Sequence, residues 1–348
     1  MENKNEGISF FEKYLSIWVV ICMVVGILIG KFLPAIPDFL NQFEYAQISI
    51  PIAILIWVMI YPMMMKVDFQ SIKNVRKNPQ GLIVSTVTSW AIKPFLMFGL
   101  ASLFFYVVFN TFIPHELAQQ YVAGAVLLGA APCTAMVFVW SNLTKGDPAH
   151  TLVQVAVNDL IILVAFVPIV SFLLGVTNIQ VPFDTLILSI VLFVVIPLIA
   201  GVLTRIFMIK NKGEEYFTEN FVPKFDNITT IGLLLTLVII FSFQGDAILD
   251  NPFHVLLIAV PLILQNVITA AFAYIMCKVF KQPHNIAAPA ALIGASDFFE
   301  LSVAVAIALF GPTSPVVLVC TVGVLTEVPV MLYLVKIVNK TKHWFIEE

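Results

Sequence analysis

Residues 129–140 read "GAAPCTAMVFVW" and lie in the middle of an apolar stretch. Pro132 has no backbone N–H to give a helix, so it interrupts the hydrogen bonding of the preceding turn. An unpaired backbone group in hydrocarbon is so unfavourable that a break is tolerated only where the freed groups line a cavity or meet a ligand. The stretch therefore predicts a broken membrane helix, with Cys133 and Thr134 facing the opening.

A second stretch has the same design. Residues 292–303, "LIGASDFFELSV", also begin with an apolar-Gly-Ala sequence and turn polar halfway along an apolar segment. We expect this break at Gly294 and Ser296. Either stretch alone could be a simple kink, because Pro is common in membrane helices and a buried Cys is usually a small apolar side chain. Two interrupted segments in corresponding positions of two halves, however, indicate a transport site.

The composition supports a membrane location. Of the 348 residues, 60% are apolar and 11% are charged, far from the roughly 45–50% and 25% of soluble domains. Ten apolar segments can each supply the roughly 20 residues that a spanning helix needs. They run over 14–33, 47–65, 81–109, 120–143, 149–175, 182–207, 227–244, 253–278, 286–310 and 315–338. Pro94 predicts a kink in the third.

The basic residues give the expected orientation. With ten spans, 16 of the 18 Lys and Arg residues fall on one side, which carries both termini. Such an excess predicts that this side is cytoplasmic, in a multi-pass protein of the plasma membrane. The N-terminus has no cleavage-site pattern, so the first segment is expected to remain in the mature protein.

Ten spans divide into two halves of five, and an odd number of spans places the second half in inverted topology. The predicted fold is an all-α membrane protein in which residues 1–348 form one polytopic domain. Repeat one covers about 10–176 and repeat two about 180–340. The spans that follow the two breaks each carry an acid in mid-segment, Asp159 and Glu327.

Ionisable residues within the spans are functional candidates, because each costs roughly 2.5–3.5 kcal/mol at the bilayer centre. They are Lys93, Asp159, Asp297, Glu300 and Glu327. Lys93 is the single cation at depth and could neutralise one of the carboxylates. Two structural alternatives stay open: Asp159 could join Asn158 in a purely structural network, and Glu327 could only make a helix-packing hydrogen bond.

Several function classes lack their motifs. The sequence has no Walker loop, dinucleotide fingerprint, HExxH motif or Ser-His-Asp spacing, so we expect neither an enzyme nor ATP-driven transport by this chain alone. The four cysteines form no metal-ligand spacing, and Cys22, Cys277 and Cys320 are interpreted as core residues. We therefore expect no cofactor, no resident metal and no nucleic-acid partner.

Six stretches together resemble the arsenical-resistance (arsenite) efflux permeases, a family of the bile acid/arsenite/riboflavin transporter superfamily. The resemblance covers about residues 10–340. The stretches are "IYPMMMKVDF" (60–69), "WAIKPF" (90–95), "GAAPCTAMVFVWSNLTKGD" (129–147), "QVAVNDL" (154–160), "ALIGASDFFELSVAVAIALFG" (291–311) and "TEVPVML" (326–332).

This resemblance implies a ten-helix fold with two inverted five-helix repeats, a panel domain and a core domain, in which discontinuous helices 4 and 9 cross. It implies export of trivalent arsenite, often by proton exchange. The family's essential cysteine carries over to Cys133 and its last-span glutamate to Glu327. The family pattern has Asn where this chain has Asp297, which adds a possible charge at the second break.

The chemistry is consistent with this resemblance. Arsenite near neutral pH is mostly an uncharged trihydroxide with a soft, thiophilic centre, which one thiolate can bind reversibly. The candidate substrate-binding residues are Cys133, Thr134, Asn158 and Glu300, and the candidate proton-coupling residues are Glu327, Asp297 and Asp159. Antimonite is a further candidate substrate.

The alternative is a sodium-coupled organic-anion symporter of the bile-acid type, with a sodium cage around Glu300. The sequence leaves the coupling ion and the oligomeric state open.

Overall fold

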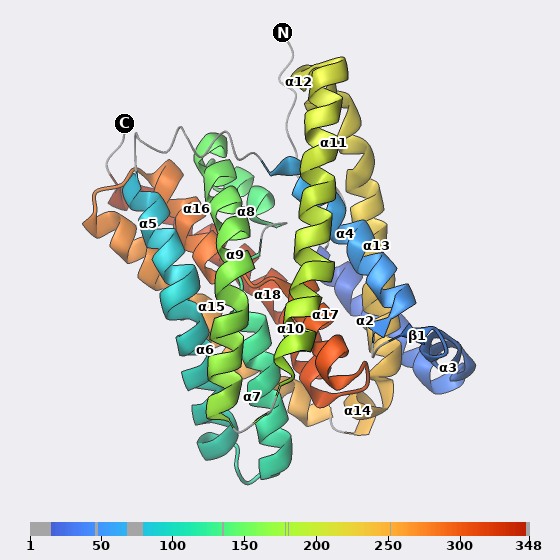
Figure 1. Cartoon of the computed structure of the whole chain (residues 1–348). Helices are drawn as coiled ribbons and strands as arrows, with labels where there is room; N and C mark the ends of the chain where they lie inside the picture. Colours follow the sequence, from blue (N-terminus) through green and yellow to red (C-terminus); the bar gives the residue numbers. More distant parts are fainter. Residues whose placement is uncertain are drawn as a thin grey trace.

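The computed structural model describes residues 15–45, 48–67, 79–133, 136–177, 179, 181–250 and 252–345. These residues are helical apart from turns, links and one short hairpin, in which β1 (Glu44–Tyr45) pairs antiparallel with β2 (Ile48–Ser49). Six helices in the described ranges are long and apolar enough to cross a membrane. The protein is thus an all-α, multi-pass membrane protein (Figure 1).

The helices form two groups. In the first, α2 packs against α13, and α4 packs against both α11 and α13; this group lies to the right in Figure 1. The group also contains several shorter helices that precede or follow these four in the chain. The bounds are α2 (Leu15–Phe32), α3 (Ala35–Asn41), α4 (Ile50–Lys66), α10 (Phe183–Ile190), α11 (Ile196–Lys212), α12 (Glu214–Tyr216), α13 (Pro223–Phe243) and α14 (Gly245–Asp250).

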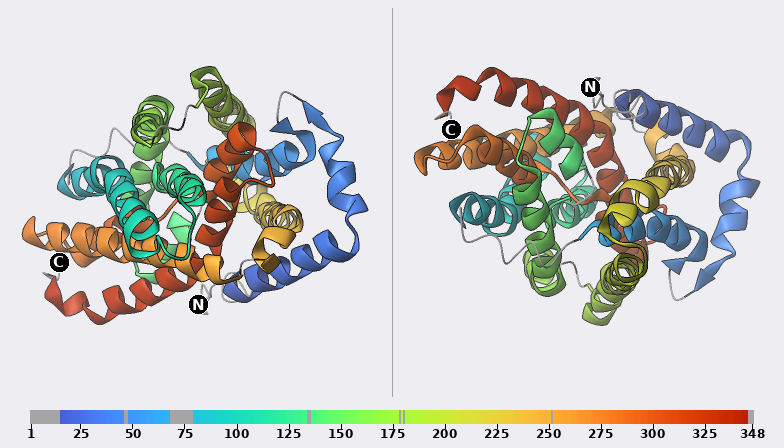
Figure 2. Two further views of the ribbon diagram at one scale, coloured as in Figure 1. Left: turned by 90° about the horizontal axis from the view of Figure 1, so that it is seen from below. Right: turned by 90° about the horizontal axis from the view of Figure 1, so that it is seen from above.

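The second group contains both interrupted helices. Here α15 packs against α16, α18 and α6, and α18 also packs against α7; Figure 2 shows α15 and α18 side by side along one edge. The bounds are α5 (Pro79–Val87), α6 (Lys93–Ser102), α7 (His115–Gly129), α8 (Val137–Leu143), α9 (Pro148–Val176), α15 (Pro252–Val279), α16 (His284–Ala295), α17 (Phe299–Phe310) and α18 (Pro315–Lys340). Contacts of α17 with α4 and α10 join the two groups.

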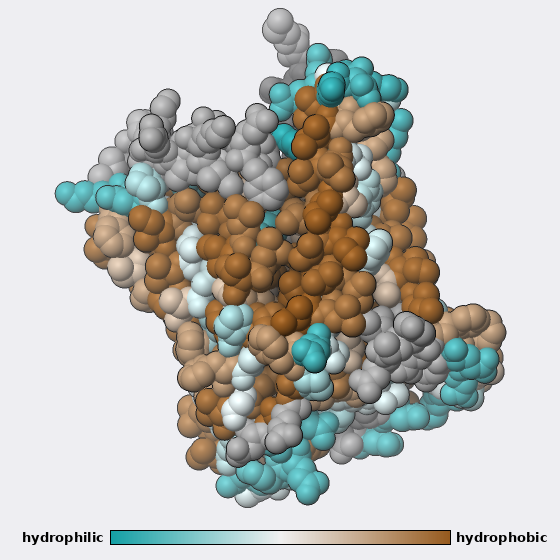
Figure 3. Space-filling view, viewed as in Figure 1, coloured by the Kyte–Doolittle hydropathy of each residue, from teal (hydrophilic) through white to brown (hydrophobic). Residues whose placement is uncertain are grey.

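The polarity of the molecule is inverted relative to a soluble protein. Large apolar side chains such as Val164, Phe207 and Leu256 are more than 60% exposed, while Lys93 and Gln265 are fully buried. Figure 3 shows the apolar belt that results, with hydrophilic residues at its two ends. A hydrocarbon solvent favours this arrangement, because lipid chains cover the apolar surface and only the interior can pair polar groups.

Three of the long helices contain a π-helical turn that ends two residues before a proline. The turns are η2 (Thr88–Ile92), η4 (Val191–Val195) and η5 (Phe217–Phe221), and the prolines are Pro94, Pro197 and Pro223. A proline ring clashes with the carbonyl four residues earlier, and in each case that carbonyl lies inside the wider π turn. The distortion predicted at Pro94 therefore takes the form of η2, immediately before α6.

Small residues let the helices of the second group approach closely. A Cβ on Gly124 of α7 would lie 2.6 Å from the carbonyl oxygen of Val316 and 2.7 Å from Cβ of Val319, both on α18. Such contacts replace the hydrophobic driving force that lipid cannot provide between membrane helices.

Gly124→Ala should therefore destabilise the protein by about 1–3 kcal/mol, since the added methyl group separates α7 from α18. Unfolding in detergent micelles measures the effect. Gly99→Ala is the matched control, because no atom lies within 4 Å of a Cβ at Gly99 in α6; there the change should stabilise the helix by about 0.5–1 kcal/mol. Equal effects of the two substitutions would contradict the packing argument.

Candidate functional site

The two interruptions meet inside the second group. Pro132, in the link between α7 and α8, forms an antiparallel bridge with Asp297, in the link between α16 and α17. Backbone hydrogen bonds flank this pair on both sides: the N–H of Phe298 donates to the carbonyl of Ala131 at 3.0 Å, and the N–H of Cys133 donates to the carbonyl of Ser296 at 3.3 Å. Backbone groups left without helical partners at one break thus form hydrogen bonds with backbone groups of the other break.

The register of this bridge explains why a proline is accommodated. In a pair flanked by hydrogen bonds in this way, the two opposed residues do not bond each other, and their own N–H groups point away from the partner strand. Pro132 has no N–H and loses nothing at that position. The N–H of Asp297 points away and donates to Oε1 of Glu327 at 3.0 Å, and the Ser296 hydroxyl donates to the same oxygen at 2.7 Å.

The fully buried ammonium of Lys93 joins both links. Its Nζ donates to the carbonyl oxygens of Ala131 at 2.9 Å and Ser296 at 2.7 Å. It also lies 3.1 Å from Oδ1 of Asp297 as an ion pair. Asp297 is therefore the carboxylate partner of Lys93, and three oxygens surround the only cation in the middle of the described spans.

Two adjacent amides of α15 complete the surroundings of Asp297. With its side-chain nitrogen turned toward these acceptors, Asn266 donates to Oδ2 of Asp297 at 3.2 Å and to the carbonyl of Ala295 at 3.1 Å. The side chain of Gln265 reaches the Ala295 carbonyl at 3.5 Å. Sequence reasoning missed both residues, although two consecutive amides inside an otherwise apolar span were a usable signal.

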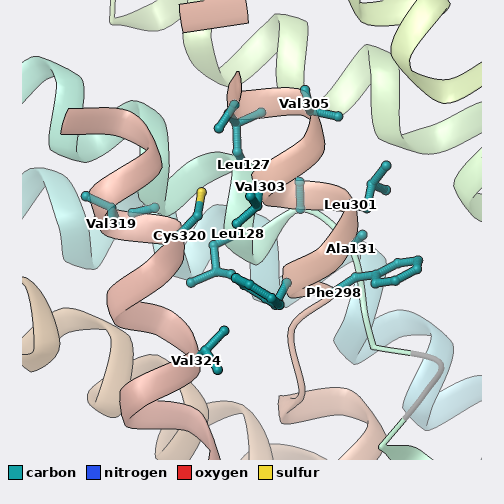
Figure 4. Packing of buried hydrophobic residues seen from close by; sticks show 14 of the residues in the cluster. Leu127, Leu128, Ala131, Phe298, Leu301, Val303, Val305, Val319, Cys320 and Val324 are labelled. Carbon is teal, nitrogen blue, oxygen red and sulfur yellow. The ribbon is translucent and has the colours of Figure 1, made fainter. Parts of the chain in front are cut away.

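Cys133 lies at this junction, 4% exposed. Its sulfur accepts a hydrogen bond from the N–H of Met136 at 3.5 Å. Thr134, the neighbouring candidate, lies outside the described residues. Cys320 lies among apolar side chains of α7, α17 and α18 (Figure 4), and its thiol donates to the carbonyl of Gly124 at 3.6 Å.

The polar residues of α9 divide into two kinds. Asn158 accepts a hydrogen bond from the indole N–H of Trp90 at 3.0 Å, which ties α9 to the π turn η2. Asp159 is 1% exposed, and neither carboxylate oxygen has a hydrogen-bond partner in the described ranges. The network that could have paired Asp159 with Asn158 is absent from this part of the chain. Within the described ranges, Asp159 is thus a buried acid that makes no side-chain hydrogen bond.

Glu300 occupies the first turn of α17 and is 7% exposed. A carboxylate at this end of a helix interacts favourably with the positive end of the helix dipole. In the chain, Glu300 follows Asp297 by three residues and lies on α17, the helix that begins after the second break.

Of the two residues expected at the second break, Ser296 directly follows the end of α16, whereas the expectation for Gly294 is wrong because Gly294 lies inside the helix. The helix α16 continues to Ala295, and the N–H of Ser296 still donates to the carbonyl of Leu292. Gly294 is instead a packing position, since a Cβ there would lie 2.9 Å from the methyl group of Thr88. Backbone pairing with the other link starts only at Ser296.

An apolar layer surrounds the crossing. Leu127, Leu128 and Ala131 of the first interrupted helix pack with Phe298 and Leu301 of the second (Figure 4). Because these side chains exclude water, charges at the crossing interact more strongly than they would at the surface.

Residues 53–251 match the model of the sodium bile acid symporter family, which defines the class as one of membrane transporters. The arsenical-resistance protein Acr3 of Alkaliphilus metalliredigens is 61% identical, over 99% of this chain and 97% of its own length. An uncharacterized transporter of Synechocystis sp. is 42% identical over 97% and 91%. The arsenical-resistance protein Acr3 of Corynebacterium glutamicum is 34% identical over 95% and 90%.

The chain therefore belongs to the arsenical-resistance permease family of the bile acid/arsenite/riboflavin transporter superfamily.

Trp90→Phe should destabilise the protein by about 1–3 kcal/mol, because the substitution leaves the buried carbonyl of Asn158 without its donor. Trp140→Phe is the control: Trp140 is also buried, 2% exposed against 8% for Trp90, but its indole N–H has no partner in the described ranges. Chemical denaturation of both purified variants compares them. The argument fails if Trp140→Phe destabilises as much as Trp90→Phe.

Proposed function

We propose that this protein exports trivalent arsenite across the plasma membrane in exchange for protons, with the Cys133 thiol as the arsenic ligand. The observation that carries the proposal is the buried junction of two interrupted helices with Cys133 beside it. Relatives that cover nearly the whole chain are named arsenical-resistance proteins. Antimonite has a similar soft centre and is the second candidate substrate.

Binding requires one exchange at arsenic. The Cys133 thiol displaces one hydroxide of the trihydroxide: a sulfur–arsenic bond forms, an arsenic–oxygen bond breaks, and water leaves with the thiol proton. A single sulfur holds arsenic weakly enough for release, whereas three would retain it. Thr134, Asn158 and Glu300 are proposed to hydrogen-bond the remaining hydroxyl groups.

The proposed architecture has ten spans in two inverted five-helix repeats, at about 10–176 and 180–340. The discontinuous fourth span is α7–α8 and the ninth is α16–α17. One interruption in each repeat, and the bridge between them, support this arrangement. The distribution of basic residues supports a cytoplasmic location of both termini. Rocking of the first helix group against the second would then expose the junction to each side in turn.

Glu327 is the proposed proton carrier, with Asp297 and Asp159 as further coupling candidates. Glu327 accepts hydrogen bonds from the Ser296 hydroxyl and the Asp297 N–H. Protonation would weaken both bonds, since a neutral carboxyl is a poorer acceptor than a carboxylate. Loading a proton would therefore loosen α18 from the crossing and couple the charge state to the fold.

Cys133→Ser should abolish arsenite transport while the protein remains folded, because oxygen is a poor ligand for soft arsenic. Uptake of labelled arsenite into everted membrane vesicles measures it. The control replaces Cys22, Cys277 and Cys320 together with Ala and should keep substantial activity. Full transport by the Cys133→Ser protein would refute the thiol mechanism.

Glu327→Gln should bind arsenite yet fail to export it against a gradient, because the amide keeps the shape of the side chain but cannot titrate. Binding to purified protein and uptake into vesicles with an imposed proton gradient separate the two effects. Unchanged proton-driven uptake would move the coupling role to Glu300, Asp297 or a sodium site. Repeating the assay with a sodium gradient tests the symporter alternative, because residues 53–251 match the sodium bile acid symporter family.

A further inference from the structure

We propose that Lys93, Asp297 and Glu327 act as one charge cluster that is neutral when its two carboxylates hold a single proton, so that Lys93 limits the exchange to one proton per cycle. This inference rests on the proposed proton coupling and deepens it. Lys93 is a positioning residue here: it contacts the backbone of both breaks and one of the two acids.

The two carboxylates and the ammonium group of the cluster lie next to one another. The two carboxylates are neighbours through one residue, because the N–H of Asp297 donates to Oε1 of Glu327 at 3.0 Å. Lys93 lies 3.1 Å from Oδ1 of Asp297. The three groups thus come from α6, the second break and α18, and meet within the low-polarity centre of the second helix group.

The net charge of the cluster depends on how many protons its two carboxylates hold. Among the described residues, the other ion pair found is Arg205 with Glu214, at a helix end. Among these residues, therefore, no second cation forms an ion pair with Asp297 or Glu327. With both acids ionised the cluster has a charge of −1, with one proton it is neutral, and with two it is +1. A buried net charge is strongly unfavourable, so the one-proton state is the resting state.

The other titratable groups around the cluster do not change this count. They sit on neighbouring elements, outside the ion pair and the hydrogen bond that define the cluster; they are Cys133 in the first break, Glu300 on α17, Cys320 on α18 and Asp159 on α9. Gln265 and Asn266 of α15 are neutral. Proton release then changes the cluster from neutral to −1, the state that the donors at the crossing must stabilise.

Lys93 also has a mechanical role, which the test must separate from its charge. Its ammonium bonds the Ala131 and Ser296 carbonyls, so its loss removes donors as well as charge. A double variant resolves the two roles. The variant Lys93→Met/Asp297→Asn lacks one cation and one acid. The remaining acid, Glu327, then gives a net charge of zero when protonated and −1 when ionised, as in the wild-type cluster with one proton and with none. The hydrogen-bond donors of Lys93 are still missing.

The transport test compares Lys93→Met with this double variant in everted vesicles over a range of pH. Lys93→Met should lower arsenite transport on the order of tenfold or more and move its pH profile upward by roughly 1–3 pH units. The double variant should recover transport and return the profile to the wild-type position. A folded double variant as inactive as Lys93→Met would overturn the inference. Lys31→Met, at an exposed cation, is the control and should change neither quantity.

An infrared measurement on the wild type needs neither folded Lys93 variants nor arsenite. Difference spectra against Asp297→Asn/Glu327→Gln isolate the carbonyl band of protonated carboxyl groups in this pair. One protonated carboxyl near neutral pH, lost in a single one-proton step in alkaline buffer, supports the inference. Two protonated carboxyls, or none, would overturn it. Because arsenite is absent, failure of the proposed substrate would leave this result unaffected.

Discussion

The contact of one ammonium group with two opposed carbonyls is the constraint on which the centre of this protein depends. Lys93 donates to Ala131 and Ser296, the residues on either side of the crossing, and pairs with Asp297 between them. These carbonyls already accept backbone N–H groups from the opposite link. The cation therefore stabilises a short piece of strand-like pairing in a place where helices alone would normally satisfy the backbone.

The breaks are compatible with the membrane because polar groups at the crossing find partners on other elements. Pro132 occupies the position whose N–H would point away, and Glu327 accepts the N–H that Asp297 directs outward. The α15 amide of Asn266 reaches the second oxygen of Asp297. Four elements from distant parts of the chain are thus held together by polar contacts, which positions an acid and a thiol near one point.

Close packing of small residues surrounds this polar centre. Gly124 brings α7 against α18, and Gly294 brings α16 against η2. These approaches place the crossing at the middle of a dense helix group, whereas helices of the first group contact this group at α9, α15, α17 and α18. A rigid group that holds the charges and a second group beside it are the parts that alternating exposure of one site requires.

The sequence by itself determined the membrane class, the positions of the apolar segments and the two polar interruptions, because hydropathy, charge and proline act locally along the chain. It also marked Lys93 and the buried acids as exceptional. The tertiary structure alone decided their partners: that Lys93 pairs with Asp297, that Glu327 receives the Asp297 N–H, and that Asn158 belongs to Trp90. It also showed that Gly294 packs while the break begins at Ser296. Partners more than 30 residues apart, such as Lys93 and Ser296, leave no periodic signal, because their contact depends on how the helices cross in space.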